Sequence, residues 1–196
     1  MVRPNCWVLG VADQHKLAEF QSTSSRVYVR PVRGSDRNAL VSMAQASQKL
    51  HHPWITPPLT NHMFRLYLKR TQREDADGFV VCLRATDQIV GVVNLNDIVR
   101  GSFMSANLSY YVDSDQQGKG YMTEALRHVI RLSFEVFGLH RLEAAIQPGN
   151  QPSKDLVKRC GFTLEGLSSD LLFIDGKWRD HERWALIDKR VSLTRP

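Results

Sequence analysis

The chain has 196 residues, of which 42% are hydrophobic and 23% charged. A single domain of this length buries a sizeable core, and its 3 widely spaced cysteines form neither a disulfide framework nor a Cys-x-x-Cys metal site. No apolar run approaches the roughly 18 residues of a membrane span, and the N-terminus lacks the pattern of a signal peptide. We therefore expect a cytoplasmic protein without membrane partners.

Lysine and arginine outnumber aspartate and glutamate by 26 to 20, which gives a net charge of +6. Such an excess favours anionic partners, for example nucleotides, phosphates, RNA or acidic proteins. No block of five like charges occurs, so a solvated surface with a modest basic excess explains the charge equally well. Charge by itself does not decide between these interpretations.

Hydrophobic periodicity predicts one α+β domain over residues 26–187, with an extension or linker at 1–25 and a tail at 188–196. The predicted elements are, in order, a strand from Arg26, helices at 36–49 and 61–73, strands at 79–83, 89–95 and 106–112, a helix at 118–137, a strand at 142–146, a helix at 153–159 and a strand pair around Asp175-Gly176. A mostly antiparallel central sheet of six to seven strands, with helices on both faces, is the natural packing.

Side-chain chemistry predicts where two of these helices begin. Ser35 and Thr60 are expected to be the N-caps of the first and second helices. Three prolines between residues 53 and 58 exclude a helix there and predict an extended loop that carries Trp54.

The segment from Tyr110 to Tyr121 has the features of an anion-binding site. A predicted strand runs into a turn with glycines at 118 and 120, and the turn opens the long helix. Glycine lets the backbone approach a ligand, while a helix N-terminus offers unpaired N–H donors and a partial positive charge, which suits a pyrophosphate. A P-loop string is absent, and Thr123 stands where a dinucleotide fingerprint needs glycine or alanine. A simple tight helix start remains the alternative.

A second group of residues follows further along the chain, where Asn150-Gln151-Pro152-Ser153 precedes Gly161-Phe162. Together with the Gln117-Gly118-Lys119-Gly120 turn, it resembles the acetyl-CoA-binding core of the GNAT N-acetyltransferase superfamily. Other segments resemble the RimJ/RimL branch, the ribosomal-protein N-terminal acetyltransferases. They are Pro53-Trp54, Gly91-x-x-Asn94, Val99 to Phe103, Phe162 to Gly166 and Ile174 to His181.

The resemblance implies the GNAT acyl-CoA N-acyltransferase fold and direct transfer of acetyl from acetyl-CoA to an amine, without a metal. It implies that Asn150 bonds the cofactor arm, that Ser153 faces the leaving sulfur and that one N–H group of the strand end from Tyr110 to Val112 polarises the thioester carbonyl. The implied catalytic residues are Ser153, Asn150 and Tyr111. The implied cofactor-binding residues are Tyr110, Tyr111, Val112, Gln117, Gly118, Lys119, Gly120, Tyr121, Met122, Asn150 and Ser153.

Three positions depart from the family pattern. Asp115 stands where many members carry Gln or Arg, Val157 replaces a tyrosine general acid, and Leu172 occupies the place of a glutamate found in some related enzymes. Backbone contacts to phosphate survive the first change, and the second shifts the acid role onto Ser153. The third leaves the base unassigned. The candidates for a water relay are Asp97, Glu143 and the polar strand around Asn94.

The weakness of any base favours an acceptor amine of low pKa. An α-amino group with a pKa of about 7.7–8.0 is roughly 10–15% neutral at pH 7, whereas a lysine near 10.4 is well under 0.1% neutral. We therefore expect a protein N-terminus, such as that of a ribosomal protein, as acceptor. A small amine, such as an antibiotic, a polyamine or an amino-acid-like compound, is the alternative within the class.

An alternative from another class is a ribosome- or RNA-associated CoA-binding module with weak or no catalysis. The sequence lacks a basic stripe and an aromatic RNA-reading motif, which argues against nucleic acid as a direct partner. The expected oligomeric state is a monomer or a homodimer.

The predicted substrate-binding residues are Trp54, Asn94, Trp178 and Asp180. For Trp54, a pocket wall and a simple core position are equally compatible with the sequence. The segment from Trp178 to His181 either closes the same cleft or only packs the final hairpin. No metal site is expected at His51-His52, because adjacent histidines diverge and no carboxylate has ligand spacing.

Overall fold

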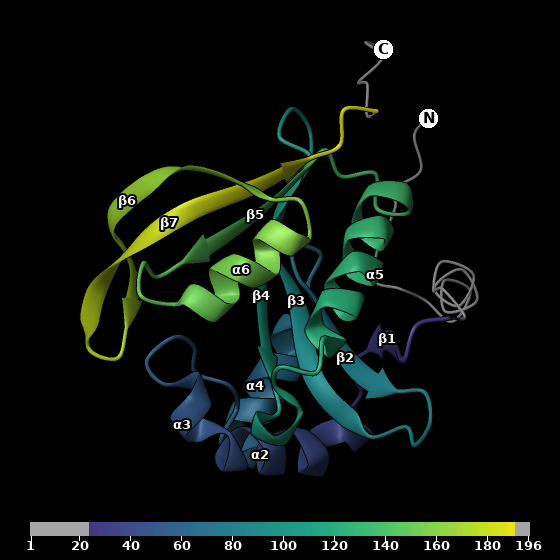
Figure 1. The fold of residues 1–196 in the computed structure, drawn as a ribbon. Coiled ribbons are helices and arrows are strands. Elements are labelled where there is room, and N and C mark those ends of the chain that lie inside the picture. The colour runs from purple at the N-terminus through teal and green to yellow at the C-terminus, as the bar shows by residue number, and fades with distance from the viewer. Residues whose placement is uncertain (1–23, 191–196) are drawn as a thin grey trace.

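The computed structural model describes residues 24–190, so most of the two expected tails lies outside the described residues. A seven-stranded sheet with the order β1-β2-β3-β4-β5-β7-β6 forms the centre (Figure 1). Its strands are β1 (Val27–Pro31), β2 (Asp77–Leu83), β3 (Ile89–Val99), β4 (Ser105–Val112), β5 (Arg141–Ile146), β6 (Thr163–Ile174) and β7 (Lys177–Ile187). All neighbours are antiparallel except the β4–β5 pair. The predicted mixed sheet is confirmed.

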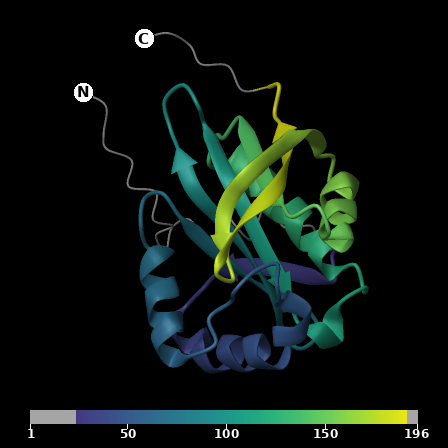
Figure 2. The same ribbon diagram turned by 90° about the vertical axis from the view of Figure 1, so that its left-hand side faces the viewer.

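Helices cover both faces of the sheet, as the two views in Figures 1 and 2 show. One face carries α5 (Tyr121–Glu135) and α6 (Gln151–Arg159), and the other carries α2 (Arg37–Ala46), α3 (Gln48–His51) and α4 (Asn61–Arg70). Successive strand residues alternate between the two faces. Phe79 and Val81 therefore pack in the core under α5, whereas Val80 and Cys82 pack against α2 and α4. Within residues 24–190, no helix is long and apolar enough to cross a bilayer.

The first predicted helix is divided in two at Ser47, which ends α2 and precedes α3. The side chain of Ser47 is buried, and its Oγ accepts a hydrogen bond of 2.9 Å from the backbone N–H of Ser114. Ser114 belongs to the short turn η2 (Ser114–Gln116) between β4 and α5. A contact distant in sequence therefore fixes the break in the helix.

The expected cap at Ser35 is wrong, because Ser35 lies in a 3-10 turn, η1 (Gly34–Asp36), and Asp36 occupies the N-cap position of α2. The buried Asp36 carboxylate accepts two hydrogen bonds of 2.8 Å from Arg30 and makes no side-chain cap. The expected cap at Thr60 is confirmed, since its Oγ1 accepts from the N–H of Met63 at 3.2 Å.

Strands β4 and β5 pair only briefly before they separate. Their parallel register runs from Ser105 opposite Arg141 to Asn107 opposite Glu143 and ends there. On its other side, β4 stays paired with β3 as far as Val112. One edge of β4 is thus free of a strand partner from Leu108 onward, in the middle of the sheet.

Candidate active site

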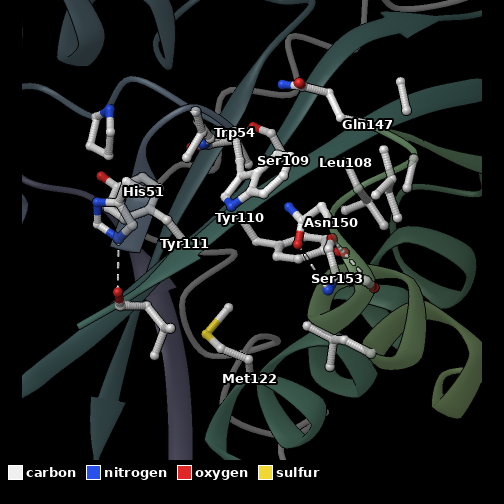
Figure 3. A pocket seen from close by; sticks show the side chains of 18 of the residues that line it. His51, Trp54, Leu108, Ser109, Tyr110, Tyr111, Met122, Gln147, Asn150 and Ser153 are labelled. Carbon is white, nitrogen blue, oxygen red and sulfur yellow. Dashed lines mark hydrogen bonds between the residues drawn. The ribbon is translucent and has the colours of Figure 1, made fainter. Parts of the chain in front are cut away.

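A cavity of about 1530 Å³ occupies the region where β4 and β5 part (Figure 3). The starts of α5 and α6 form one wall, and the loop after α3, together with α4 and the β6–β7 hairpin, forms the other. Residues from all these elements meet here. Among the lining residues are His51, Trp54, Asn94, Ser109, Tyr110, Tyr111, Met122, Asn150, Ser153 and His181.

The glycine turn presents a row of unpaired backbone donors to this cavity. Gly118 and Gly120 adopt φ angles of 75° and 83°, in the left-handed region that favours glycine. The N–H groups of Thr123 and Glu124 both donate to the carbonyl of Gly120, at 3.1 and 3.3 Å. Within the described residues, the amides of 117–122 before them have no hydrogen-bond acceptor. Such a concave row at a helix N-terminus fits a diphosphate.

Arg26 supports this turn from outside the predicted site. Its Nη2 donates to the carbonyl of Lys119 at 2.9 Å, its guanidinium pairs with Glu124, and it lies 4.8 Å from the centre of the Tyr121 ring. The side chain of Lys119 donates to Gln116 and does not line the cavity. Arg26 precedes the turn by more than 90 residues, so no local spacing in the sequence could reveal its role.

The register of β4 decides which N–H groups of the strand end can polarise the thioester, and it excludes the amide of Tyr111, one of the predicted catalytic residues. Val92 lies opposite Tyr111, and the N–H of Asp113 donates to the carbonyl of Val90 at 2.9 Å. Because antiparallel strands alternate hydrogen-bonded and free groups, the Tyr111 N–H points toward β3 and is not available. The backbone groups of Tyr110 and Val112 face the free edge. One of them is already used, since the Val112 carbonyl accepts from His51 Nε2 at 2.9 Å.

Asn150, Ser153 and Tyr110 meet at the start of α6 (Figure 3). Asn150 is the N-cap, and its Oδ1 accepts from the Ser153 N–H at 3.2 Å, which leaves its Nδ2 for another partner. The hydroxyl oxygens of Ser153 and Tyr110 are 2.7 Å apart. Burial raises the pKa of Tyr110 above its ordinary value, so this phenol stays protonated. Val157, at the position of the missing family tyrosine, is fully buried in the core.

Asn94 lies under the opposite side of the cavity and is 3% exposed. Its Oδ1 accepts from Tyr67 Oη at 2.8 Å, and its Nδ2 donates to Ser109 Oγ at 3.2 Å. Asn96 Nδ2 donates to the same Ser109 oxygen at 3.1 Å. In the assigned orientation of these amides, both lone pairs of Ser109 are occupied, so its hydroxyl is a donor toward the cavity.

Trp178 and Asp180 do not line the cavity, although residues beside them do. The Trp178 ring packs edge-on against Phe173, with 5.6 Å between centroids, and Phe173 is part of the lining. Asp180 Oδ1 accepts from the N–H of Asp170, at a bulge of β6. Both residues brace the β6–β7 hairpin, and a direct contact with substrate stays a prediction.

Residues 26–163 match the family model described as an acetyltransferase (GNAT) domain. The chain belongs to the GNAT acetyltransferase family. The predicted fold, the reaction class of N-acetyl transfer and acetyl-CoA as the acetyl donor are thereby confirmed. The free amides of residues 117–122 suit the diphosphate of this donor.

Individual relatives place this GNAT protein in the RimJ/RimL-like branch. It is 35% identical over 172 residues to the [ribosomal protein uS5]-alanine N-acetyltransferase of Escherichia coli, covering 84% of this chain and 89% of that protein. The structure of Mycobacterium smegmatis RimJ in complex with CoA-disulfide superposes with a TM-score of 0.77, at 28% identity over 86% of this chain and 85% of the other. A spermidine N(1)-acetyltransferase of Vibrio cholerae is 24% identical over 139 residues, or 70% of this chain and 79% of its own.

Proposed function

We propose that this enzyme acetylates the N-terminal α-amino group of a protein, with a ribosomal protein as its acceptor. The observation that carries the proposal is the 35% identity to the uS5-alanine N-acetyltransferase, which extends over nearly the whole of both chains. The lining of the acceptor side supports it. That side includes neutral hydrogen-bonding groups, of which Asn94, Asn96 and Ser109 form one connected set.

Acetyl-CoA is proposed to bind along the free edge of β4. The amides of residues 117–122 hold its diphosphate, with Arg26 keeping the turn in shape from behind. The free backbone groups of Tyr110 and Val112 pair with its pantetheine arm, and one of these two N–H groups polarises the thioester carbonyl. Asn150 uses its remaining Nδ2 donors on the same arm.

Ser153 is proposed to stabilise the leaving sulfur by donating a hydrogen bond to it, and Tyr110 assists Ser153 as a positioning residue. A thiol has a reference pKa near 8.5, so a hydroxyl hydrogen bond suffices to stabilise the departing thiolate. The Tyr110 phenol lies within hydrogen-bond distance of the Ser153 hydroxyl and orients it. Together they take the place of the family tyrosine that Val157 replaces.

A polyamine acceptor is disfavoured by the charges around the cavity. A polyamine carries several positive charges and calls for free carboxylates. The cavity is lined by three aspartates and by three arginines, so the formal charges of these groups balance. The aspartates are Asp97, Asp155 and Asp175, and the arginines are Arg70, Arg159 and Arg183.

Acetyl-CoA consumption against a panel of acceptors tests the proposal. The panel contains peptides that begin with alanine or serine, the same peptides with a blocked N-terminus and one internal lysine, and spermidine. We expect the free N-terminal peptides to give the highest kcat/KM. Faster turnover of spermidine, or equal turnover of the blocked peptides, contradicts the proposed acceptor. Calorimetry with acetyl-CoA is the companion test, and no binding at tens of micromolar contradicts the enzyme itself.

The location and oligomeric state belong to the same proposal. We place the enzyme in the cytoplasm, where ribosomal proteins are made, and we propose a monomer or a homodimer. Cell fractionation checks the first statement, and light scattering of the purified protein checks the second.

A further inference from the structure

The carboxylates that the sequence analysis considered for a water relay are poor candidates for the base that this reaction needs. Asp97 is exposed and bound to Asn107. Burial would raise the pKa of Glu143, but hydrogen bonds from Arg141 and Arg183 outweigh it and hold the pKa below its ordinary value. Glu143 also lies outside the cavity lining. These are two of the three relay candidates from the sequence, and the third, Asn94, cannot take up a proton.

Two buried histidines line the cavity, and they differ in which ring nitrogen is free to accept a proton from a substrate. His51 donates from Nε2 to the Val112 carbonyl, while its Nδ1 is fully buried and has no partner among the described residues. Neither nitrogen of His51 can therefore reach a substrate. His181 shows the opposite arrangement. Its Nδ1 lies 2.9 Å from the backbone carbonyl of Arg179, which can only accept, so Nδ1 carries the proton and Nε2 keeps a lone pair.

The alternation of β7 places His181 on the acceptor side of the sheet. Glu182 accepts from Lys154 of α6, and Trp184 lies in the core beneath α5 and α6. Residues 181 and 183 therefore face the opposite side, and both line the cavity. His181 is only 2% exposed, yet its Nε2 has no hydrogen-bond partner within residues 24–190 and is not completely enclosed by other atoms. The small exposed part thus includes a free base nitrogen.

We propose that His181 is the general base, with Nε2 accepting the proton of the attacking amine. The identity of that amine rests on the proposed function, whereas the proton transfer to His181 applies to any amine acceptor. As the acceptor nitrogen bonds to the thioester carbonyl carbon, its surplus proton passes to Nε2. The carbon–sulfur bond breaks, and the departing thiolate accepts a hydrogen bond from the Ser153 hydroxyl, which Tyr110 holds in place. The imidazolium releases its proton to solvent, and the thiolate takes up one proton from solvent. The products are the acetylated amine and the CoA thiol.

The surroundings keep this imidazole neutral near pH 7. Burial lowers the pKa of His181 below its ordinary value, against weaker opposing effects of the Arg179 carbonyl and the Asp180 carboxylate. On the same face of β7, His181 is flanked by two arginines, Arg179 and Arg183, and Arg183 is paired with Glu143 of β5. From β6, the residue opposite His181 is the uncharged Ser168. A base that is already unprotonated at working pH matches the task.

His181→Gln tests the proposal, with acetyl-CoA and an alanine-starting peptide as substrates. General base catalysis contributes about 10²- to 10⁴-fold, and we expect kcat at pH 7 to fall by about 100-fold while the KM for acetyl-CoA changes less than about threefold. The matched control is His128→Gln, because His128 is also a buried histidine with a lowered pKa but lies outside the cavity. An unchanged kcat in His181→Gln, or an equal loss in His128→Gln, overturns the proposal.

The pH profile of the wild-type enzyme gives a second test that needs no variant to fold. We expect kcat to decline on the acid side with an apparent pKa below about 6.5, and this limb to be absent in His181→Gln. A flat acid side in the wild type overturns the proposal. If the wild type acetylates spermidine but not peptides, the proposed acceptor fails, and the same profile measured with spermidine still decides whether His181 is the base.

Discussion

The hydroxyl oxygens of Tyr110 and Ser153 lie 2.7 Å apart, although the two residues are 43 positions apart in the chain. One comes from the free edge of β4 and the other from the first turn of α6. The pair therefore spans the two elements between which the thioester must lie. This geometry gives a direct test of the proposed roles of Ser153 and Tyr110.

Ser153→Ala is expected to lower kcat by about 10- to 100-fold, because a hydrogen bond to a charged group contributes about 1.5–3 kcal/mol. Tyr110→Phe should cause a smaller loss, and the double variant should be no slower than Ser153→Ala, since the tyrosine acts through the serine. Steady-state kinetics measure all three. Ser105→Ala, on the same strand but outside the cavity, is the control. Additive losses in the double variant contradict a shared role.

Gly118→Ala is expected to weaken binding of acetyl-CoA. A side chain at φ 75° costs about 1–2 kcal/mol, and a loop that relaxes to avoid this strain loses its row of N–H donors. The KM for acetyl-CoA should rise about 5- to 30-fold, since about 1.4 kcal/mol corresponds to a factor of ten. Gly138→Ala is the matched control for Gly118→Ala, because Gly138 also has a left-handed φ angle, of 62°, and open space around an added Cβ. An equal rise in that control would show a general loss of stability.

Tyr67→Phe tests whether the network under the cavity orients the acceptor. The variant leaves the buried Asn94 Oδ1 without its donor, at a cost of about 1–3 kcal/mol, and frees Asn94 to turn away from Ser109. We expect a higher KM for the acceptor peptide and an unchanged KM for acetyl-CoA. Tyr28→Phe also removes a tyrosine hydroxyl, but one that donates to Asp87 at an exposed place outside the cavity. If both variants behave alike in acceptor KM, Asn94 has no part in substrate binding.

Asp77 predicts a pH-dependent loss of stability. Burial raises its pKa to about 7, against a smaller opposing effect of Arg100, whereas an unfolded aspartate has a pKa near 3.9. The folded state therefore binds the Asp77 proton more tightly than the unfolded state does. As pH rises from about 4 to 7, the folded protein must either keep this proton or bury a charge, so its free energy of unfolding falls. In thermal melts, the Tm of Asp77→Asn minus that of the wild type should grow over this range and then level off. A constant difference refutes the assignment, and Asp75→Asn, at an exposed neighbour, is the control.

Features that depend on nearby residues could be predicted from the sequence. The Thr60 cap and the glycine turn are both local, and the structure contains each of them. The long helix was expected from residue 118 but begins at Tyr121, because the left-handed Gly120 precedes it as N-cap. Strand β3 also continues beyond the predicted residue 95 to Val99.

Features that depend on how distant segments meet could not be predicted. The direction of the Tyr111 amide follows from the β3–β4 register, and the break at Ser47 follows from its bond to Ser114. Arg26 likewise reaches Lys119 only through the tertiary fold. The neutrality of His181 depends on its burial, and alternation along a strand gives no measure of burial depth. Pairwise geometry is the information that a single sequence lacks.

The early separation of β4 and β5 also has a consequence for solubility. An unpaired strand edge is a template on which other chains can add, and exposed edges promote aggregation. In this enzyme the open edge from Leu108 to Val112 lies inside the sheet, between flanking strands, with its mouth lined by helix starts and a loop. A neighbouring chain cannot align along it as it could along an outer strand. The fold thus leaves unpaired backbone groups accessible to a small ligand but not to a strand of another copy of the protein.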